Sequence, residues 1–161
     1  MLRRRGSLRS FTPRVELRMS YAHLSQHERC QGVPMGGYLT AAPKGNAPVL
    51  IVEALKDPDA ANLDRVQIIK GWVSSDGKTH EHVYDVAWSG DRKPGSDGKL
   101  PPVGNTVNVA DASYTNSIGA PMLSASWKDP GFDPKQRAFY YVRVLEIPTR
   151  AGRPSTPSIS G

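Results

Sequence analysis

Three aspartates lie within one short stretch of the chain, at Asp57, Asp59 and Asp64. Calcium prefers carboxylate oxygens, so these three residues are the chain's candidate metal ligands. The alternating oxygen ligands, central glycine and terminal glutamate of an EF-hand loop are missing here. Aspartate is also common in turns, and Lys56 and Arg65 flank the stretch. We therefore favour a structural loop in front of a strand over a calcium site.

Two histidines, His80 and His82, are separated by a single residue. On a β-strand such residues share a face, and two imidazoles so placed could bind zinc. They follow a turn, however, and no cysteine or third ligand stands at a familiar spacing. The pattern therefore favours histidines at the solvent edge of a strand.

Aromatic side chains at alternating strand positions could form a sugar-binding platform or pack in a core. The candidates are Trp72, Tyr84, Trp88, Trp127 and Tyr140. Because a β-sandwich core needs aromatics at such positions, core packing is the preferred interpretation. A small-ligand or carbohydrate-binding module remains the alternative. The sequence has no recognisable catalytic triad, nucleophile elbow or phosphate loop, so it assigns no catalytic or cofactor-binding residue.

The net charge of +6 is concentrated at the start of the chain. Residues 1–18 hold six arginines and one glutamate, which is +5, and leave 6 − 5 = +1 for the remainder. We therefore expect no nucleic-acid partner. No signal peptide or membrane-spanning stretch is predicted, which leaves the localisation unknown. The single cysteine, Cys30, cannot form an internal disulfide.

Residues 63–91 predict a β-hairpin, because polar and apolar residues alternate on both sides of a short turn. Asp76 and Gly77 supply that turn. Residues 49–55 and 139–147 are apolar on both faces and predict strands in the middle of a sheet. In the hairpin strands the apolar residues lie mainly on one face, which predicts a sheet with one packed face and one face partly exposed to solvent.

Residues 90–109 predict a long loop with a possible strand at 106–109, and the chain is rich in glycine and proline, with 15 and 14 residues. The predicted fold class is mainly β: an antiparallel β-sandwich or partial sandwich with long Gly/Pro-rich loops and irregular termini.

Five segments of the chain resemble a bacterial family, the domain-of-unknown-function family 3604. They are PMGGYL (34–39), APVLIVEALKDPDAANLDRVQIIKGWV (47–73), VYDVAWSGDRKPGSDGKLPPVGNTV (83–107), YTNSIGAP (114–121) and DPGFDPKQRAFYYVRVLEIPT (129–149). The resemblance covers residues 33–149. Full-length members are several times longer, and the matched region is similar to their C-terminal part.

The resemblance implies a function for the parent protein more than for this chain. The larger N-terminal portion of the family resembles metal-dependent hydrolases of the polymerase-and-histidinol-phosphatase kind, in which a divalent metal is expected. The motifs of that portion are not found here. We therefore expect a non-catalytic, β-rich C-terminal fragment without a cofactor of its own. Its expected partner is the remainder of the parent protein, with self-association as a further possibility and no membrane partner.

The sequence predicts three parts: an irregular basic segment at 1–32, a β-rich domain at 33–149 and a disordered tail at 150–161. Residues 21–29 could form a short helix. The sequence at both ends of the chain departs from that of the family. We expect these ends to be either out-of-frame reading of a GC-rich gene or natural disordered tails.

Overall fold

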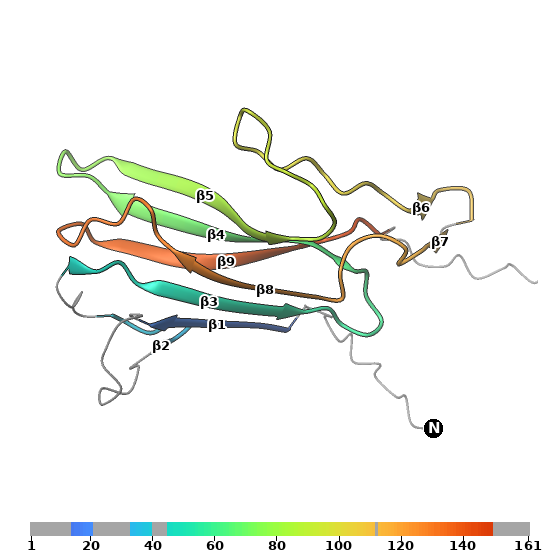
Figure 1. The fold of residues 1–161 in the computed structure, drawn as a ribbon, viewed down its shortest axis with the longest axis horizontal. Helices are drawn as coiled ribbons and strands as arrows, with labels where there is room; N and C mark the ends of the chain where they lie inside the picture. Colours follow the sequence, from blue (N-terminus) through green and yellow to red (C-terminus); the bar gives the residue numbers. More distant parts are fainter. Residues whose placement is uncertain (1–13, 21–32, 40–44, 112, 150–161) are drawn as a thin grey trace, which may run out of the picture.

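A computed structural model describes the backbone of residues 14–20 and all atoms of residues 33–39, 45–111 and 113–149. The described part is mainly β and contains two antiparallel sheets and a small two-stranded one. Figure 1 shows the strands of the two larger sheets running along the long axis of the molecule. Within the described residues no helix is long and apolar enough to cross a membrane. The predicted fold class is confirmed.

The first sheet has the strand order β2-β1-β3-β8. Its strands are β1 (Arg14–Ser20), β2 (Val33–Pro34), β3 (Val49–Leu55) and β8 (Met122–Lys128). β1 pairs with β3 along its whole length. The prediction of an irregular segment at 1–32 is therefore wrong for β1, where Val15, Leu17 and Met19 alternate with polar residues in a strand pattern that the sequence analysis missed. The predicted helix at 21–29 and the tail at 150–161 lie outside the described residues.

The second sheet has the order β5-β4-β9 and contains the predicted hairpin. β4 (Leu63–Val73) and β5 (Thr79–Trp88) pair antiparallel, and β9 (Ala138–Glu146) pairs with the other edge of β4. Gly77 has a φ of 80° in the turn, a conformation that glycine adopts without steric cost. The hairpin prediction is confirmed.

Side chains from both sheets form one core. Leu50, Val52 and Ala54 of β3 meet Val66 and Ile68 of β4, and all five are 0% exposed. Partly buried side chains from β5, β8 and β9 pack against this cluster. Full burial of each of the Leu, Val and Ile side chains in this cluster contributes about 1.5–3 kcal/mol, so this layer holds the sheets together.

The structure corrects which strands are buried on both faces. β9, predicted to be central, pairs only with β4 among the described strands, and its outward residues Phe139 and Tyr141 are exposed. β3 is central, but Ile51 on its outer face is 47% exposed. β4, predicted to be one-sided, is buried from Leu63 to Gly71. Large side chains on the flanking strands explain this burial: on the outer face Ile69, which is 0% exposed, lies between Val83 of β5 and Tyr141 of β9.

The predicted long loop follows β5 and is fixed to β4 by arginine. The Arg65 guanidinium donates to the carbonyl oxygens of Leu100 (2.8 Å) and Pro101 (3.0 Å). Beyond it, β6 (Val107–Asn108) pairs with β7 (Ser113–Tyr114), so the possible strand at 106–109 is present as two residues. Figure 1 shows this small sheet at the end of the molecule away from the β4–β5 turn.

Candidate functional site

In the loop that follows β3, a lysine ammonium group lies among the backbone carbonyl oxygens. Lys56 Nζ donates to the carbonyl oxygens of Asp57 (3.2 Å), Pro58 (3.2 Å) and Ala60 (3.0 Å). Asp57 Oδ1 accepts a hydrogen bond from the backbone N–H of Asp59 at 2.9 Å, which is a local turn. The ammonium group therefore occupies the position among the loop carbonyls that a metal ion would need.

Asp64, the third predicted ligand, lies in a different environment. Its carboxylate is nearly buried and forms ion pairs with Arg65 Nε at 3.0 Å and with Arg92 Nη1 at 2.7 Å. No group of three His, Cys, Asp or Glu side chains that could hold a metal ion is found in the part of the chain that the structure describes. The contacts of Asp57, Asp59 and Asp64 therefore favour the structural interpretation of the loop.

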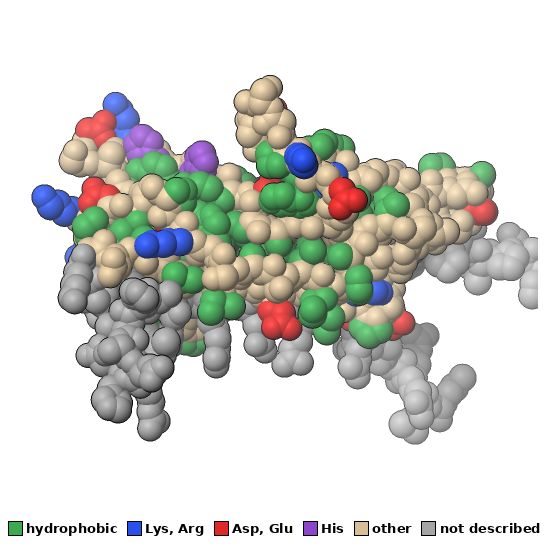
Figure 2. All heavy atoms as spheres, viewed as in Figure 1, with side chains coloured by type: hydrophobic (Ala, Val, Ile, Leu, Met, Phe, Trp, Pro, Cys, Tyr) green, Lys and Arg blue, Asp and Glu red, His purple; other side chains and the backbone are tan. Residues whose placement is uncertain are grey.

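The two histidines lie on the same face of β5 and are exposed, as the spacing predicts. His80 stacks on Trp72, with ring centroids 5.3 Å apart and an interplanar angle of 14°. His82 contacts Tyr84 with a centroid distance of 4.3 Å. Figure 2 shows histidine side chains grouped over the turn end of β5. Their ring contacts favour a packing role.

Three of the five predicted aromatics lie between the sheets. Tyr84 contacts Trp127 at a centroid distance of 4.7 Å, and Trp127 contacts Tyr140 at 6.4 Å. Trp127 and Tyr140 also pack against the core. Trp88 is half-buried and donates its Nε1–H to the carbonyl oxygen of Arg92 at 2.9 Å. These contacts agree with core packing rather than with a flat platform.

A buried ion pair that sequence reasoning missed joins β4 to the loop after β8. Lys70 Nζ lies 2.6 Å from Asp129 Oδ2, and the two side chains are 4% and 0% exposed. Lys70 also donates to the carbonyl oxygen of Gly131 at 2.7 Å. Asp129 accepts further hydrogen bonds from Tyr140 Oη (2.7 Å) and Gly131 N–H (2.9 Å). Each charge is therefore paired and hydrogen-bonded, which burial demands.

The groups around the Lys70–Asp129 pair shift the pKa values of two side chains, Asp129 and Tyr84. Burial alone would raise the pKa of Asp129, but hydrogen bonds from Lys70, Tyr140 and Gly131, together with the Lys70 charge, hold this pKa below its usual value. Burial, with the nearby Asp129 charge, raises the pKa of the Tyr84 phenol. The one sequence signal for this site is the inward parity of Lys70, which follows Val66 and Ile68 at alternating positions.

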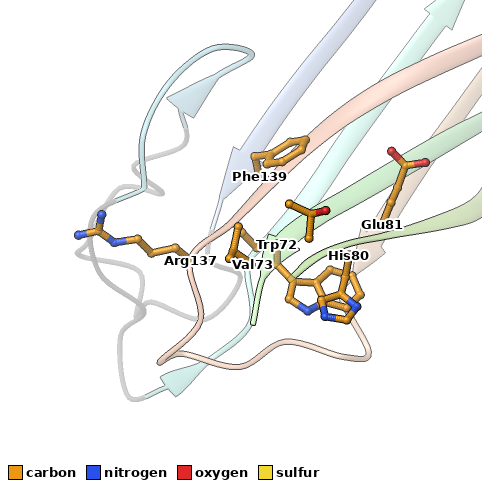
Figure 3. A pocket seen from close by; sticks show the side chains of 8 residues that line it. Trp72, Val73, His80, Glu81, Arg137 and Phe139 are labelled. Atoms are coloured by element: carbon orange, nitrogen blue, oxygen red, sulfur yellow. The ribbon is translucent and has the colours of Figure 1, made fainter. Parts of the chain in front are cut away.

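The outer face of the second sheet carries exposed aromatic rings that the sequence did not single out. Phe139 is 60% exposed and Tyr141 is 40% exposed. Their centroids are 6.3 Å apart and the ring planes are within 14° of parallel. A pocket of about 570 Å³ adjoins Phe139 and includes Thr79, Glu81 and Arg137. Figure 3 shows Phe139 and Glu81 well separated from the overlapping Trp72 and His80 rings.

One comparison with known proteins gave a match. A family model described as "Protein of unknown function (DUF3604)" matches residues 12–153. The match begins well before residue 33, where the resemblance was expected to start, and it includes β1. Residues 12–32 and 150–153, which we expected to depart from the family, are therefore part of the match. The curated proteins and the solved structures gave no match.

Proposed function

The chain belongs to the DUF3604 family of proteins of unknown function, and we propose that it serves there as a non-catalytic β-rich domain. In this proposal the domain packs against a larger portion of the parent protein, which resembles metal-dependent hydrolases. The outer face of the first sheet is the docking surface for that portion.

The observation that carries the proposal is a group of exposed apolar side chains on the outer face of β3 and β8, with the exposed Glu53 between two of them. Ile51, Leu55 and Met122 are 47%, 48% and 51% exposed, and Leu55 and Met122 lie directly opposite each other in the sheet. We call these three residues the sheet-A patch. Apolar side chains gathered on one face are typical of surfaces that another protein part covers.

The charged groups in the core support a structural rather than a catalytic role. Lys70 and Asp129 satisfy each other, and Asp64 is held by Arg65 and Arg92. A nucleophile or general base needs a lone pair that substrate can reach, whereas these groups are enclosed by their own partners.

A binding experiment tests the docking surface. The chain and the separately produced N-terminal portion of a full-length DUF3604 protein are mixed, and the dissociation constant is measured by isothermal titration calorimetry. We expect a complex that Met122→Glu weakens at least about tenfold, because a charge in an apolar contact must be desolvated. Tyr38→Ala removes a 90% exposed aromatic outside the patch and serves as the matched control. Absence of a complex, or equal binding by Met122→Glu, would overturn the docking proposal.

An activity assay tests the non-catalytic assignment separately. The purified chain is incubated with phosphate monoester and diester substrates in the presence of Mn²⁺ or Zn²⁺. We expect no turnover above a buffer blank. Metal-dependent hydrolysis that copurifies with the chain would overturn the assignment.

A further inference from the structure

We propose that the outer face of the second sheet binds a neutral oligosaccharide chain, with Phe139 and Tyr141 as stacking platforms and polar side chains of β5 and β9 as hydrogen-bonding partners. This inference does not depend on the docking surface, which lies on the other sheet.

The aromatic pair offers exposed apolar ring surface on one face of the sheet. Phe139 and Tyr141 stand two residues apart on β9, so their side chains share the outer face. Their rings are 6.3 Å apart and nearly parallel. Sugars present flat C–H faces that pack on aromatic faces. Two exposed, nearly parallel rings on one face can each offer apolar surface to a sugar unit.

A glycine on the neighbouring strand makes room for the first ring. Phe139 extends across from β9 to β4, where Gly71 is its partner in the register. A Cβ atom on Gly71 would lie 2.2 Å from Phe139 Cζ, far closer than two carbons can approach. Gly71 therefore sets the position of the Phe139 ring without touching a ligand.

Hydrogen-bonding side chains line the pocket next to the first ring, Phe139. The pocket next to Phe139 is lined by Thr79 and Glu81 of β5 and by Arg137 just before β9. The Glu81 and Arg137 side chains are exposed, and neither takes part in an ion pair among the residues that the structure describes. A hydroxyl, a carboxylate and a guanidinium can together donate to and accept from sugar hydroxyl groups. Apolar platforms with a few polar groups are the usual composition of small-ligand sites.

A row of polar side chains bounds the apolar part of this face. Beyond Tyr141 the same face carries a hydrogen-bonded polar row: Arg143 Nε donates to Gln67 Oε1 at 2.8 Å, and Gln67 Nε2 donates to Asp85 Oδ1 at 2.8 Å. The apolar part of this face, which also includes Val73 and Val83, therefore ends at this polar row. Stable protein–protein interfaces contain few charged residues at their centre, whereas a sugar chain can bind next to charged side chains.

Direct binding tests the site. The chain is applied to an array of neutral plant, fungal and bacterial oligosaccharides. Cellopentaose and maltopentaose, together with the best array ligand, are then measured by calorimetry. We expect binding that Phe139→Ala and Tyr141→Ala each weaken at least about tenfold. Tyr38→Ala again removes an exposed aromatic from elsewhere on the surface and should bind like the parent chain.

The Gly71→Ala variant tests the position of the Phe139 ring without changing the ring itself. The added methyl must displace the Phe139 ring, which is exposed and can move into solvent, so the fold should survive while oligosaccharide affinity falls. A melting curve of the variant checks the fold.

Three results would overturn the proposal. The first is no binding to any oligosaccharide on the array, and the second is binding that the Phe139 and Tyr141 variants leave unchanged. The third is a dimer in sedimentation experiments that Phe139→Ala dissociates, because the face would then belong to a second copy of the chain.

Discussion

The Lys70–Asp129 pair joins the loop between β8 and β9 to β4. We predict that Asp129→Asn lowers the free energy of unfolding by about 3–5 kcal/mol at pH 7, because it leaves a buried ammonium without its counterion. The two side chains are 4% and 0% exposed, so solvent screens this loss little. Urea denaturation followed by tryptophan fluorescence measures it.

The same variant gives a pH test. The pKa of Asp129 in the fold lies below its usual value, so its contribution to stability is complete above about pH 4 and is lost as the pH falls through the folded pKa. The difference between the parent chain and Asp129→Asn should therefore narrow in acid. The double variant Lys70→Met with Asp129→Leu should recover part of the lost stability. A constant difference from neutral to strongly acidic pH would contradict the ion-pair account.

Calcium should not stabilise the loop after β3, because Lys56 already satisfies its carbonyl oxygens. We predict an unchanged melting temperature in millimolar Ca²⁺ for the parent chain and for Asp59→Asn. Lys56→Met should instead lower the free energy of unfolding by about 1 kcal/mol, since three carbonyls lose a charged donor near the surface. A rise of several degrees with Ca²⁺ that Asp59→Asn abolishes would make this loop a metal site.

At the scale of elements, the connection into β8 is held where Gly119 passes β4. Gly119 has a φ of 84°, and a Cβ there would lie 2.7 Å from Asn62 Cβ and 2.9 Å from the Leu63 carbonyl oxygen. We predict that Gly119→Ala costs about 3–4 kcal/mol, because backbone strain and a clash add together.

Gly98 provides the matched control for this connection. Its φ is 72°, but nothing lies within 4 Å of an added Cβ. Gly98→Ala should therefore cost only the strain, about 1–2 kcal/mol, in the same denaturation experiment. Equal losses in the two variants would show that the close approach to β4 contributes nothing.

Local patterns predicted some of these elements, and long-range partners decided the others. The hairpin of β4 and β5 was predictable because its turn and its alternation lie in one continuous stretch. The edge position of β9 was not, since two-sided apolar character describes a strand and not its neighbours. Phe139 and Tyr141 were assigned to a sheet interior for that reason. The partners Lys70 and Asp129 are 59 residues apart, and no local pattern relates them.

For the molecule as a whole, exposed apolar side chains on one sheet predict association when the rest of the parent protein is absent. We expect the isolated chain to show concentration-dependent association in sedimentation velocity, through the sheet-A patch. Met122→Glu should reduce it, because a carboxylate would have to be desolvated in the contact. Tyr38→Ala should not.

A chain that remains monomeric would contradict this expectation. A monodisperse monomer across the accessible concentration range, with a sharply cooperative two-state melt, would show that this face needs no cover. The docking proposal would then rest on the binding experiment alone.

The position of β4 between a near and a distant strand also determines when the domain can form during protein synthesis. β5 follows β4 after a short turn, whereas β9 is not made until the chain has reached Glu146. Ile68 can pair with Tyr84 of β5 early, but its partner on the other side, Val142 of β9, is synthesised later. The nascent chain therefore carries a half-paired apolar hairpin while more than fifty further residues are translated. Slow, non-local closure of this kind exposes a growing chain to misassembly, and a chaperone would act in that interval.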